Sequence, residues 1–93
     1  MEYPKLLIVE DEMSTRMILE NIFHKDYRLF SAANGEQALS LAQEEHPDLI
    51  LLDIMMPGID GYEVARRLQD DIATRDIPII FLTALDGVSE EVQ

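Results

Sequence analysis

The chain has 93 residues, a length that suits one small domain. Its 19 acidic residues outnumber its 7 lysines and arginines, and the formal net charge of -12 argues against nucleic acid or an anionic membrane as a direct partner. The chain contains no cysteine, which excludes disulfides and thiolate metal sites. No apolar run is long enough to span a bilayer. Because the N-terminus also lacks a signal-peptide pattern, we expect a cytoplasmic location.

The first half of the chain alternates between strand and helix patterns. An apolar run at residues 6–9 predicts a strand, and a weaker pattern at residues 27–31 predicts an edge strand. Residues 13–24 lie between them and are periodic like a helix. The apolar face expected for that helix consists of Met13, Met17, Ile18, Ile22 and, less regularly, Phe23. We interpret Met13 and Met17 as part of its buried stripe.

The second half continues the alternation. Asn34 and Asp60 are each followed three residues later by Gln37 or Glu63, the capping-box spacing at a helix N-terminus. Continuous apolar runs at residues 49–52 and 79–82 predict strands buried on both faces. The order β-α-β-α-β-α-β predicts an α/β fold in which helices cover both faces of a parallel sheet.

Acidic side chains follow two of the predicted strands. Glu10, Asp11 and Glu12 come directly after the first strand, and Asp53 ends the strand at residues 49–52. Ligands of open α/β sheets bind beyond the carboxyl ends of the strands, so a ligand site is favoured for Asp11 and Asp53. For Glu10, a site and a solvated loop remain equally compatible with the sequence. For Glu12 we favour the first turn of a helix, where acids are stabilised.

Neighbouring strands would crowd these carboxylates into one small space. Such crowding raises a pKa or costs stability unless a cation compensates it. Mg²⁺ prefers oxygen ligands, needs only one or two carboxylates and leaves room for phosphate oxygens. The sequence therefore predicts a Mg²⁺ site. Arg16 lies one turn into the first helix and could approach this site, but we interpret it as a solvated surface residue.

Four stretches of the sequence resemble the receiver domain of two-component response regulators. They are LIVEDE at residues 7–12, ANGEQAL at 33–39, PDLILLDIMMPGIDG at 47–61 and IPIIFLTA at 77–84. The resemblance implies a flavodoxin-like doubly wound parallel sheet in the order 2-1-3-4-5. The chain would form strands 2-1-3-4 of that sheet. The fifth strand and the last helix would be missing, so residues 1–93 would form one receiver domain incomplete at its C-terminus.

The resemblance also implies roles for individual residues. Asp53 matches the phosphoacceptor, which takes a phosphoryl group from a histidine kinase or a phosphotransfer protein. Glu10 and Asp11 match the acidic pair, which binds Mg²⁺ together with Asp53. The backbone carbonyl of Met55 matches a further metal ligand, and Thr83 matches the hydroxyl residue that contacts the phosphoryl group. The expected output is altered binding to an output domain or effector protein.

Neither lysine of the chain, Lys5 nor Lys25, matches the lysine with which the family contacts the phosphoryl group. The strand at residues 79–82 would also form an open sheet edge, which invites self-association. An alternative function is therefore a phosphorylation-independent interaction module with a receiver fold. An aspartate-nucleophile phosphatase is disfavoured, because Met55 occupies the position where such enzymes carry a second aspartate.

Overall fold

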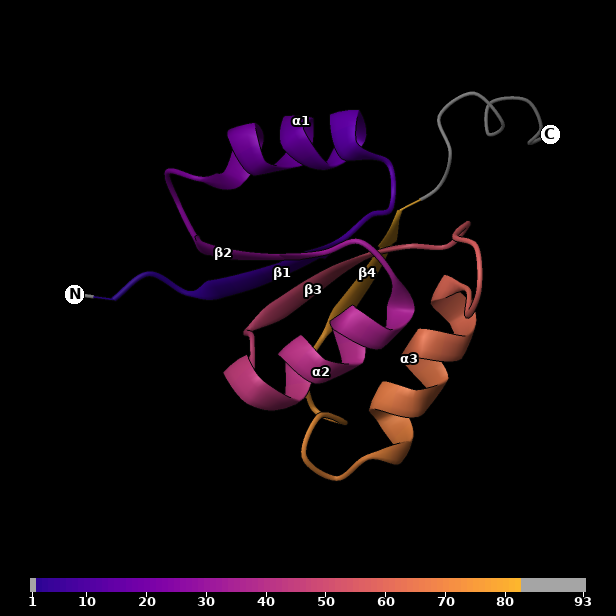
Figure 1. Cartoon of the computed structure of the whole chain (residues 1–93). Helices are drawn as coiled ribbons and strands as arrows, with labels where there is room; N and C mark the ends of the chain where they lie inside the picture. Colours follow the sequence, from indigo (N-terminus) through magenta and orange to yellow (C-terminus); the bar gives the residue numbers. More distant parts are fainter. Residues whose placement is uncertain (1, 83–93) are drawn as a thin grey trace, which may run out of the picture.

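A computed structural model of the chain describes residues 2–82. Within these residues, four parallel strands form one sheet in the order β2-β1-β3-β4, and three helices cover it (Figure 1). The strands are β1 (Lys5–Val9), β2 (Arg28–Ala32), β3 (Leu49–Asp53) and β4 (Ile79–Leu82). The helices are α1 (Met13–Phe23), α2 (Gly35–Glu45) and α3 (Gly61–Asp70). The predicted doubly wound sheet and its strand order are confirmed.

The strand register brings the carboxyl ends of β1 and β3 level with each other. Val9 of β1 pairs with Leu52 of β3, and Asp53 pairs with Leu82 of β4. Apart from Lys5 at the start of β1 and Asp53 at the end of β3, both strands consist of apolar residues, as is typical of parallel strands that are buried on both faces. The residues that directly follow β1 therefore lie beside the last residue of β3.

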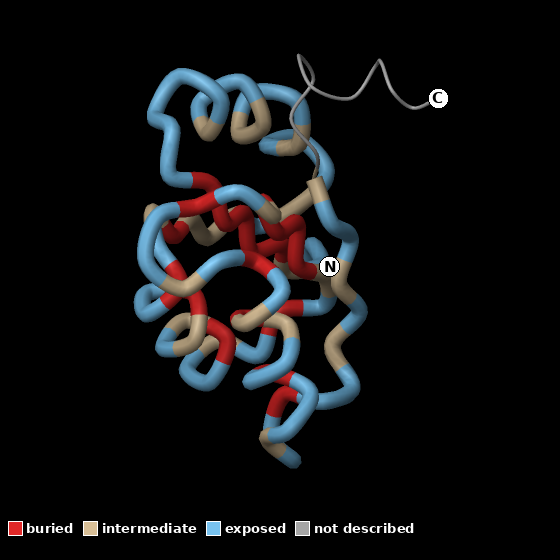
Figure 2. Tube along the Cα trace, turned by 90° about the vertical axis from the view of Figure 1, so that its right-hand side faces the viewer, coloured by how far each residue is buried: buried red, intermediate tan, exposed pale blue. Residues whose placement is uncertain are grey.

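The two faces of the sheet are covered unequally. Alternate residues of β1 and β3 pack against α2 and α3 on one face, where Val64 and Leu68 of α3 are fully enclosed. On the other face, α1 is the helix of the described residues that packs against Leu6, Ile8 and Leu51 (Figure 1). The burial trace shows the difference, since α2 and α3 contain buried positions whereas α1 contains only intermediate and exposed ones (Figure 2). The densest packing therefore lies between the sheet and the α2–α3 layer.

Both predicted N-caps are confirmed. The Asn34 side chain accepts a hydrogen bond from the backbone N–H of Gln37 at 2.9 Å, and Asp60 accepts one from Glu63 at 2.9 Å. At α2, the second hydrogen bond of the capping box differs from the expected one. The Gln37 side chain accepts from the N–H of Ala33 at 2.8 Å, one residue before the cap. Each helix is thus fixed at its start, close to the carboxyl edge of the sheet.

The expected core face of α1 is confirmed for Phe23 and is wrong for its other four residues. Four of its apolar side chains are more than half exposed: Met13 63%, Met17 58%, Ile18 60% and Ile22 58%. Leu19 and Phe23 are the residues of α1 that pack against the sheet. Apolar periodicity identified a stripe on the helix, but in the described chain this stripe faces away from β1 and β3. The reason is that spacing alone does not say which side of a helix meets a sheet.

β4 is an outer strand of the described sheet, as expected for residues 79–82. The burial on both faces that was expected for residues 79–82 is wrong, since Ile80 and Phe81 are 51% and 39% exposed and this edge carries accessible apolar surface. Self-association through it stays a prediction. Among the described residues, no helix combines the length and apolar character needed to cross a membrane.

Candidate functional site

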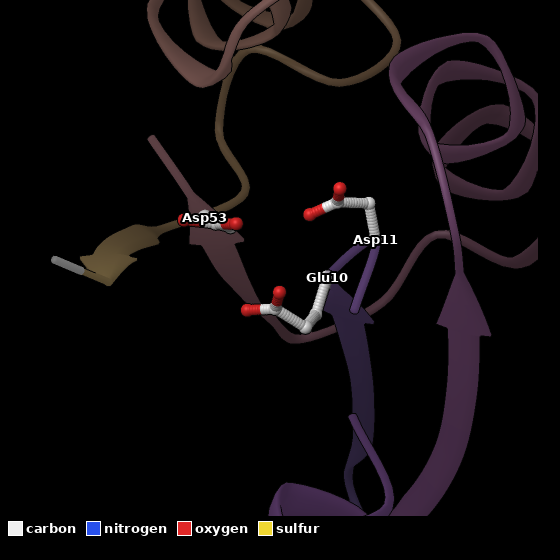
Figure 3. A group of neighbouring side chains, drawn as sticks. All are labelled: Glu10, Asp11 and Asp53. Atoms are coloured by element: carbon white, nitrogen blue, oxygen red, sulfur yellow. The ribbon is translucent and has the colours of Figure 1, made fainter. Parts of the chain in front are cut away.

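Three carboxylates meet at the carboxyl edge of the sheet. Glu10 and Asp11 follow β1, and Asp53 is the last residue of β3. One oxygen from each carboxylate lies within 4.8 Å of an oxygen of the other two. Figure 3 shows the Glu10 and Asp11 side chains directed toward Asp53 across the gap between the strand ends. Glu10 is 6% exposed and Asp53 8%, whereas Asp11 is exposed. The sequence predicted this meeting for Asp11 and Asp53 and left it open for Glu10.

The backbone around Glu10 is fixed by neighbours on both sides. Its N–H donates to the carbonyl of Ala32 at the end of β2, at 3.0 Å. Its carboxylate accepts a hydrogen bond from the N–H of Glu12 at 3.1 Å. This hydrogen bond joins residues only two positions apart, so it turns the Glu10 side chain back over its own loop. Glu10 therefore points into the site rather than into solvent.

Asp53 is held by the turn that follows it. Its Oδ1 accepts a hydrogen bond from the N–H of Met55 at 3.2 Å. The next residue, Ile54, donates to the carbonyl of Leu82 at 3.2 Å and accepts from the N–H of Gly61 at 3.0 Å. A side chain at Gly61 would overlap the carbonyl oxygen of Asp53, so this close approach of α3 to β3 requires glycine. The start of α3 thus supports the peptide that carries the central carboxylate.

Burial and crowding make these carboxylates harder to ionise. The pKa of Glu10 is raised from 4.5 to about 7, first by loss of water and then by the charges of Asp53 and Asp11, while the hydrogen bond from the Glu12 N–H opposes the rise. Burial also raises the pKa of Asp53, which the hydrogen bond from Met55 partly offsets. Such shifts are typical of carboxylates that share a site without a cation. The metal-free site therefore favours partial protonation near neutral pH.

Glu12 lies outside this cluster, as expected. It is the N-cap of α1, and its carboxylate accepts hydrogen bonds from the Ser14 hydroxyl at 2.6 Å and the Thr15 N–H at 3.3 Å. These bonds, the Ser14 bond first, lower the pKa of Glu12. Two acids of one loop, separated by Asp11, thus differ in role, because Glu10 is buried against Asp53 while Glu12 caps the start of a helix.

The interpretation of Arg16 as a solvated surface residue is wrong. Arg16 is only partly exposed, and its Nη1 donates to the backbone carbonyl of Glu10 at 2.8 Å. A signal for this position exists in the sequence, since Arg16 is three residues before Leu19 and seven before Phe23, the sheet-facing residues of α1. This position was not predicted because the apolar pattern placed the buried side of the helix on Met13 and Met17.

Three further residues that the sequence raised are Met55, Thr83 and Lys5. The side chain of Met55 is 70% exposed, and the role of its backbone carbonyl as a metal ligand stays a prediction. Thr83 lies outside the described residues. Lys5 donates to the carbonyl of Glu45 at 2.9 Å, at the amino end of the sheet, and thus lies away from the acidic cluster. In the part of the chain that the structure describes, the cluster contains no lysine.

The donor set fits Mg²⁺. All three side chains offer oxygen, the ligand type that Mg²⁺ takes at about 2.0–2.1 Å. The carboxylate oxygens already lie within 4.8 Å of each other, two of the three carboxylates are buried, and no base within the described cluster neutralises them. A divalent cation would relieve the repulsion that raises the pKa of Glu10 and Asp53.

Comparison with known proteins places this geometry in a family. A family model described as "Response regulator receiver domain" matches residues 6–93. The chain is 42% identical over 90 residues to the response regulator PleD of Caulobacter vibrioides, covering 96% of the chain and 20% of that protein. It is 42% identical to sporulation initiation phosphotransferase F of Bacillus subtilis, covering 92% of the chain and 71% of the relative.

A third relative is the probable transcriptional regulator ycf27 of Porphyridium aerugineum, at 46% identity, with coverage of 99% of the chain and 38% of the relative. The chain thus spans about a fifth of PleD and less than two fifths of ycf27.

Solved structures agree with the sequence relatives. The receiver domain of sensor histidine kinase PA1611 from Pseudomonas aeruginosa, which has a magnesium ion coordinated in its active-site cleft, superimposes with a TM-score of 0.85 at 30% identity. The match covers 98% of this chain and 75% of that one. A putative response regulator from Chloroflexus aurantiacus matches with a TM-score of 0.86 at 34% identity, covering 98% and 75%. This chain belongs to the response regulator receiver domains, the signalling modules of two-component systems.

Proposed function

We propose that Asp53 is the phosphoacceptor of this receiver domain. The observation that carries the proposal is the position of Asp53, a nearly buried carboxylate at the end of β3 that faces two further acids. The Met55 N–H and the peptide contacts of Ile54 restrict its orientation. A carboxylate held in this way is prepared for attack on a phosphorus atom without a large reorganisation.

In the proposed reaction, a carboxylate oxygen of Asp53 forms a bond to the phosphorus of a phosphohistidine or of acetyl phosphate. The bond between phosphorus and the leaving group breaks, and its electron pair stays with the imidazole nitrogen or with the acetate oxygen. The imidazole then takes a proton from solvent. The product on the chain is an aspartyl phosphate, an established form of carboxylate nucleophilic catalysis. Water later hydrolyses this acyl phosphate and returns the carboxylate.

Asp11, Asp53 and the Met55 carbonyl would hold Mg²⁺ directly, with Glu10 contributing through water. The ion supplies charge neutralisation for the phosphoryl oxygens, which is the main requirement of phosphoryl transfer. Glu10 must lose its proton for this role. Because its pKa is raised, binding of the cation is coupled to release of that proton. We retain Thr83 as the proposed hydroxyl contact of the transferred phosphoryl group.

We further propose that the phosphodonor is a sensor histidine kinase or a phosphotransfer protein. The added charge on Asp53 would then change the binding of an output domain or effector protein. The relatives support the proposal through the receiver domain that they share with this chain. PleD and ycf27 are much longer than this chain, and one relative is named a phosphotransferase.

Intact mass spectrometry tests the proposal. We expect the parent chain to gain one phosphoryl group on incubation with acetyl phosphate and Mg²⁺, and to gain none in EDTA. Asp53→Asn should remove the gain. Asp26→Asn is the matched control, because it makes the same chemical change at an exposed turn after α1 and should leave the gain intact.

Two other outcomes would contradict the proposal. A parent chain that binds Mg²⁺ but gains no phosphoryl group would favour a phosphorylation-independent interaction module. Labelling that persists in Asp53→Asn would place the acceptor elsewhere and overturn the assignment of Asp53.

A further inference from the structure

The sheet-facing side of α1 carries two polar contacts besides its apolar ones. Leu19 and Phe23 pack against the sheet. Glu20, on the same side, accepts a hydrogen bond from the Ser31 hydroxyl of β2 at 2.6 Å. Arg16 is one turn closer to the start of the helix and donates to the Glu10 carbonyl at 2.8 Å. The first of these polar contacts anchors the helix to β2, and the second anchors it to the acidic loop.

The Arg16 contact is directed at backbone. Among the described residues, Arg16 forms no ion pair with a carboxylate, whereas Arg66 and Arg67 both pair with Glu63. Arg16 is nevertheless partly buried beside a cluster of three acids. A guanidinium placed to neutralise charge would meet a carboxylate in a forked geometry. Its bond to a carbonyl instead suggests control of backbone position.

The carbonyl that Arg16 binds belongs to the peptide joining Glu10 to Asp11. The N–H of Glu10 is already fixed by Ala32, and its side chain by Glu12. The Arg16 bond fixes the remaining polar group of this residue and so sets the plane of the following peptide. The side chain of Asp11, the exposed member of the cluster, is attached directly after that peptide. Rotation of this peptide would redirect the Asp11 carboxylate away from Asp53.

We propose that Arg16 is a positioning residue for the acidic site. Its bond to the Glu10 carbonyl holds the Glu10–Asp11 loop in the arrangement that aims both carboxylates at Asp53. The inference rests on the proposed function in that Mg²⁺ is the ligand of the site. Outer contacts that orient metal ligands typically contribute about 10–100-fold to metal affinity. We expect an effect at the lower end, because Arg16 acts through backbone.

Electrostatics and positioning predict changes of opposite sign, which makes the inference testable. Removal of a positive charge near the site lowers the repulsion of Mg²⁺ and should tighten binding. Loss of the carbonyl bond frees the loop and should weaken binding. We therefore expect Arg16→Met to weaken Mg²⁺ binding by about tenfold, as measured by isothermal titration calorimetry or by NMR titration. Unchanged or tighter binding would overturn the proposal.

Two control variants separate positioning from other effects. Arg28→Met removes the same charge from an exposed residue at the amino end of β2, and should not weaken Mg²⁺ binding. Ser31→Ala removes the neighbouring hydrogen bond between α1 and β2 without a change of charge. If Ser31→Ala weakened Mg²⁺ binding as much as Arg16→Met, a general loosening of α1 would explain both, and the specific role of Arg16 would fail.

A measurement on the unmutated chain keeps the proposal testable if Arg16→Met fails to fold. The guanidinium protons of Arg16 should exchange with water more slowly than those of exposed Arg28, and their NMR signals should shift when Mg²⁺ is added. Exchange as fast as that of Arg28, with no shift on Mg²⁺ binding, would contradict the proposal. If the parent binds Mg²⁺ but is not phosphorylated, the proposed function fails while the Arg16 inference stands. A parent that binds no Mg²⁺ would overturn both.

Discussion

Carboxylates occur in two opposite environments on this small domain. Glu10 is buried beside Asp53 and Asp11, and desolvation raises its pKa to about 7. Glu63 lies on α3, where hydrogen bonds from Arg66 and then Arg67 lower its pKa to about 2. Among the described residues, the first environment gathers three acids that form no ion pair, whereas the second pairs one acid with two arginines. A carboxylate that is already neutralised has little to offer a cation, so the contrast indicates which group is available for a ligand.

The two environments also differ in what they contribute to folding. The ion pairs of α3 are solvent-exposed, with side-chain exposures of 32–60% for Glu63 and Arg66, and pairs of this kind contribute little to stability. The acidic cluster opposes folding at neutral pH, because ionisation in a buried site is disfavoured. Proteins retain such unfavourable groups at functional sites. The cluster is therefore the region where a ligand can change the stability of this domain most.

The pH dependence of stability should show the contrast most strongly. The folded chain without metal retains a proton on Glu10 up to about pH 7, whereas the unfolded chain loses it near 4.5. The folded state thus binds more protons in this interval, and its stability should fall as pH rises from about 4.5 to about 7. A shift of this size corresponds to roughly 3 kcal/mol at most. Urea unfolding in EDTA over this pH range measures it.

Glu10→Gln should flatten that decline and raise the metal-free stability above pH 7. Glu44→Gln, the same change at an exposed position of α2, should leave the slope as it is in the parent. A parent whose stability rises between pH 5 and 7 in EDTA, with a slope that Glu10→Gln does not alter, would contradict the account of the cluster.

Gly61 connects the two regions, because it starts α3 and contacts the peptide of Asp53. Gly61→Ala would place a Cβ against the Asp53 carbonyl oxygen, and the backbone must shift to accommodate it. We expect a loss of roughly 2 kcal/mol of stability, in the range of overpacked sites, and weaker Mg²⁺ binding. Thermal unfolding and a Mg²⁺ titration measure the two effects.

Gly58→Ala is the control for a change of glycine in the same loop. Gly58 has a φ of 79°, and nothing lies within 4 Å of its would-be Cβ. The substitution should cost roughly 1–2 kcal/mol through backbone strain while Mg²⁺ binding is retained. If both variants bound Mg²⁺ like the parent, support of Asp53 by the start of α3 would be disproved.

The smallest effect is expected on α3. Glu63→Gln removes the partner of Arg66 and Arg67 from an exposed face. Because Glu63 is ionised in the folded state down to about pH 2, its contribution is present above the unfolded pKa of 4.5 and is lost as pH falls toward 2. We expect a slight fall in the urea midpoint at pH 7, reduced by salt, and unaltered Mg²⁺ binding. A clear change in Mg²⁺ affinity would show that the two regions are coupled.

The strands and the acidic site were predictable for a physical reason. Unbroken apolar runs can be buried on both faces only in a covered parallel sheet, and the carboxyl ends of such strands meet at one edge. Asp11 and Asp53 follow from these two rules. The weaker strand was displaced by one residue, from residues 27–31 to Arg28–Ala32, because its polar residues give an ambiguous boundary.

The side on which α1 packs was not predictable in the same way. Met13, Met17, Ile18 and Ile22 were expected in the core together with Phe23, but only Phe23 of these packs against the sheet, where it is joined by Leu19. Apolar periodicity depends only on which residues are hydrophobic. It contains no information on how the loops before and after the helix orient it against the sheet. That error also concealed Arg16, whose polar side chain reaches a backbone carbonyl rather than solvent.

The most direct test of the account compares the stability of the parent and Asp53→Asn in EDTA and in saturating Mg²⁺. Asp53→Asn removes one charge from the cluster, so it should be the more stable chain without metal. At Mg²⁺ concentrations about 100-fold above its dissociation constant, the parent should gain about 2.7 kcal/mol and the variant much less. The order of stability should therefore reverse. If Mg²⁺ stabilised both chains equally, or neither, the three carboxylates would not form the cation site on which the proposed phosphoryl transfer depends.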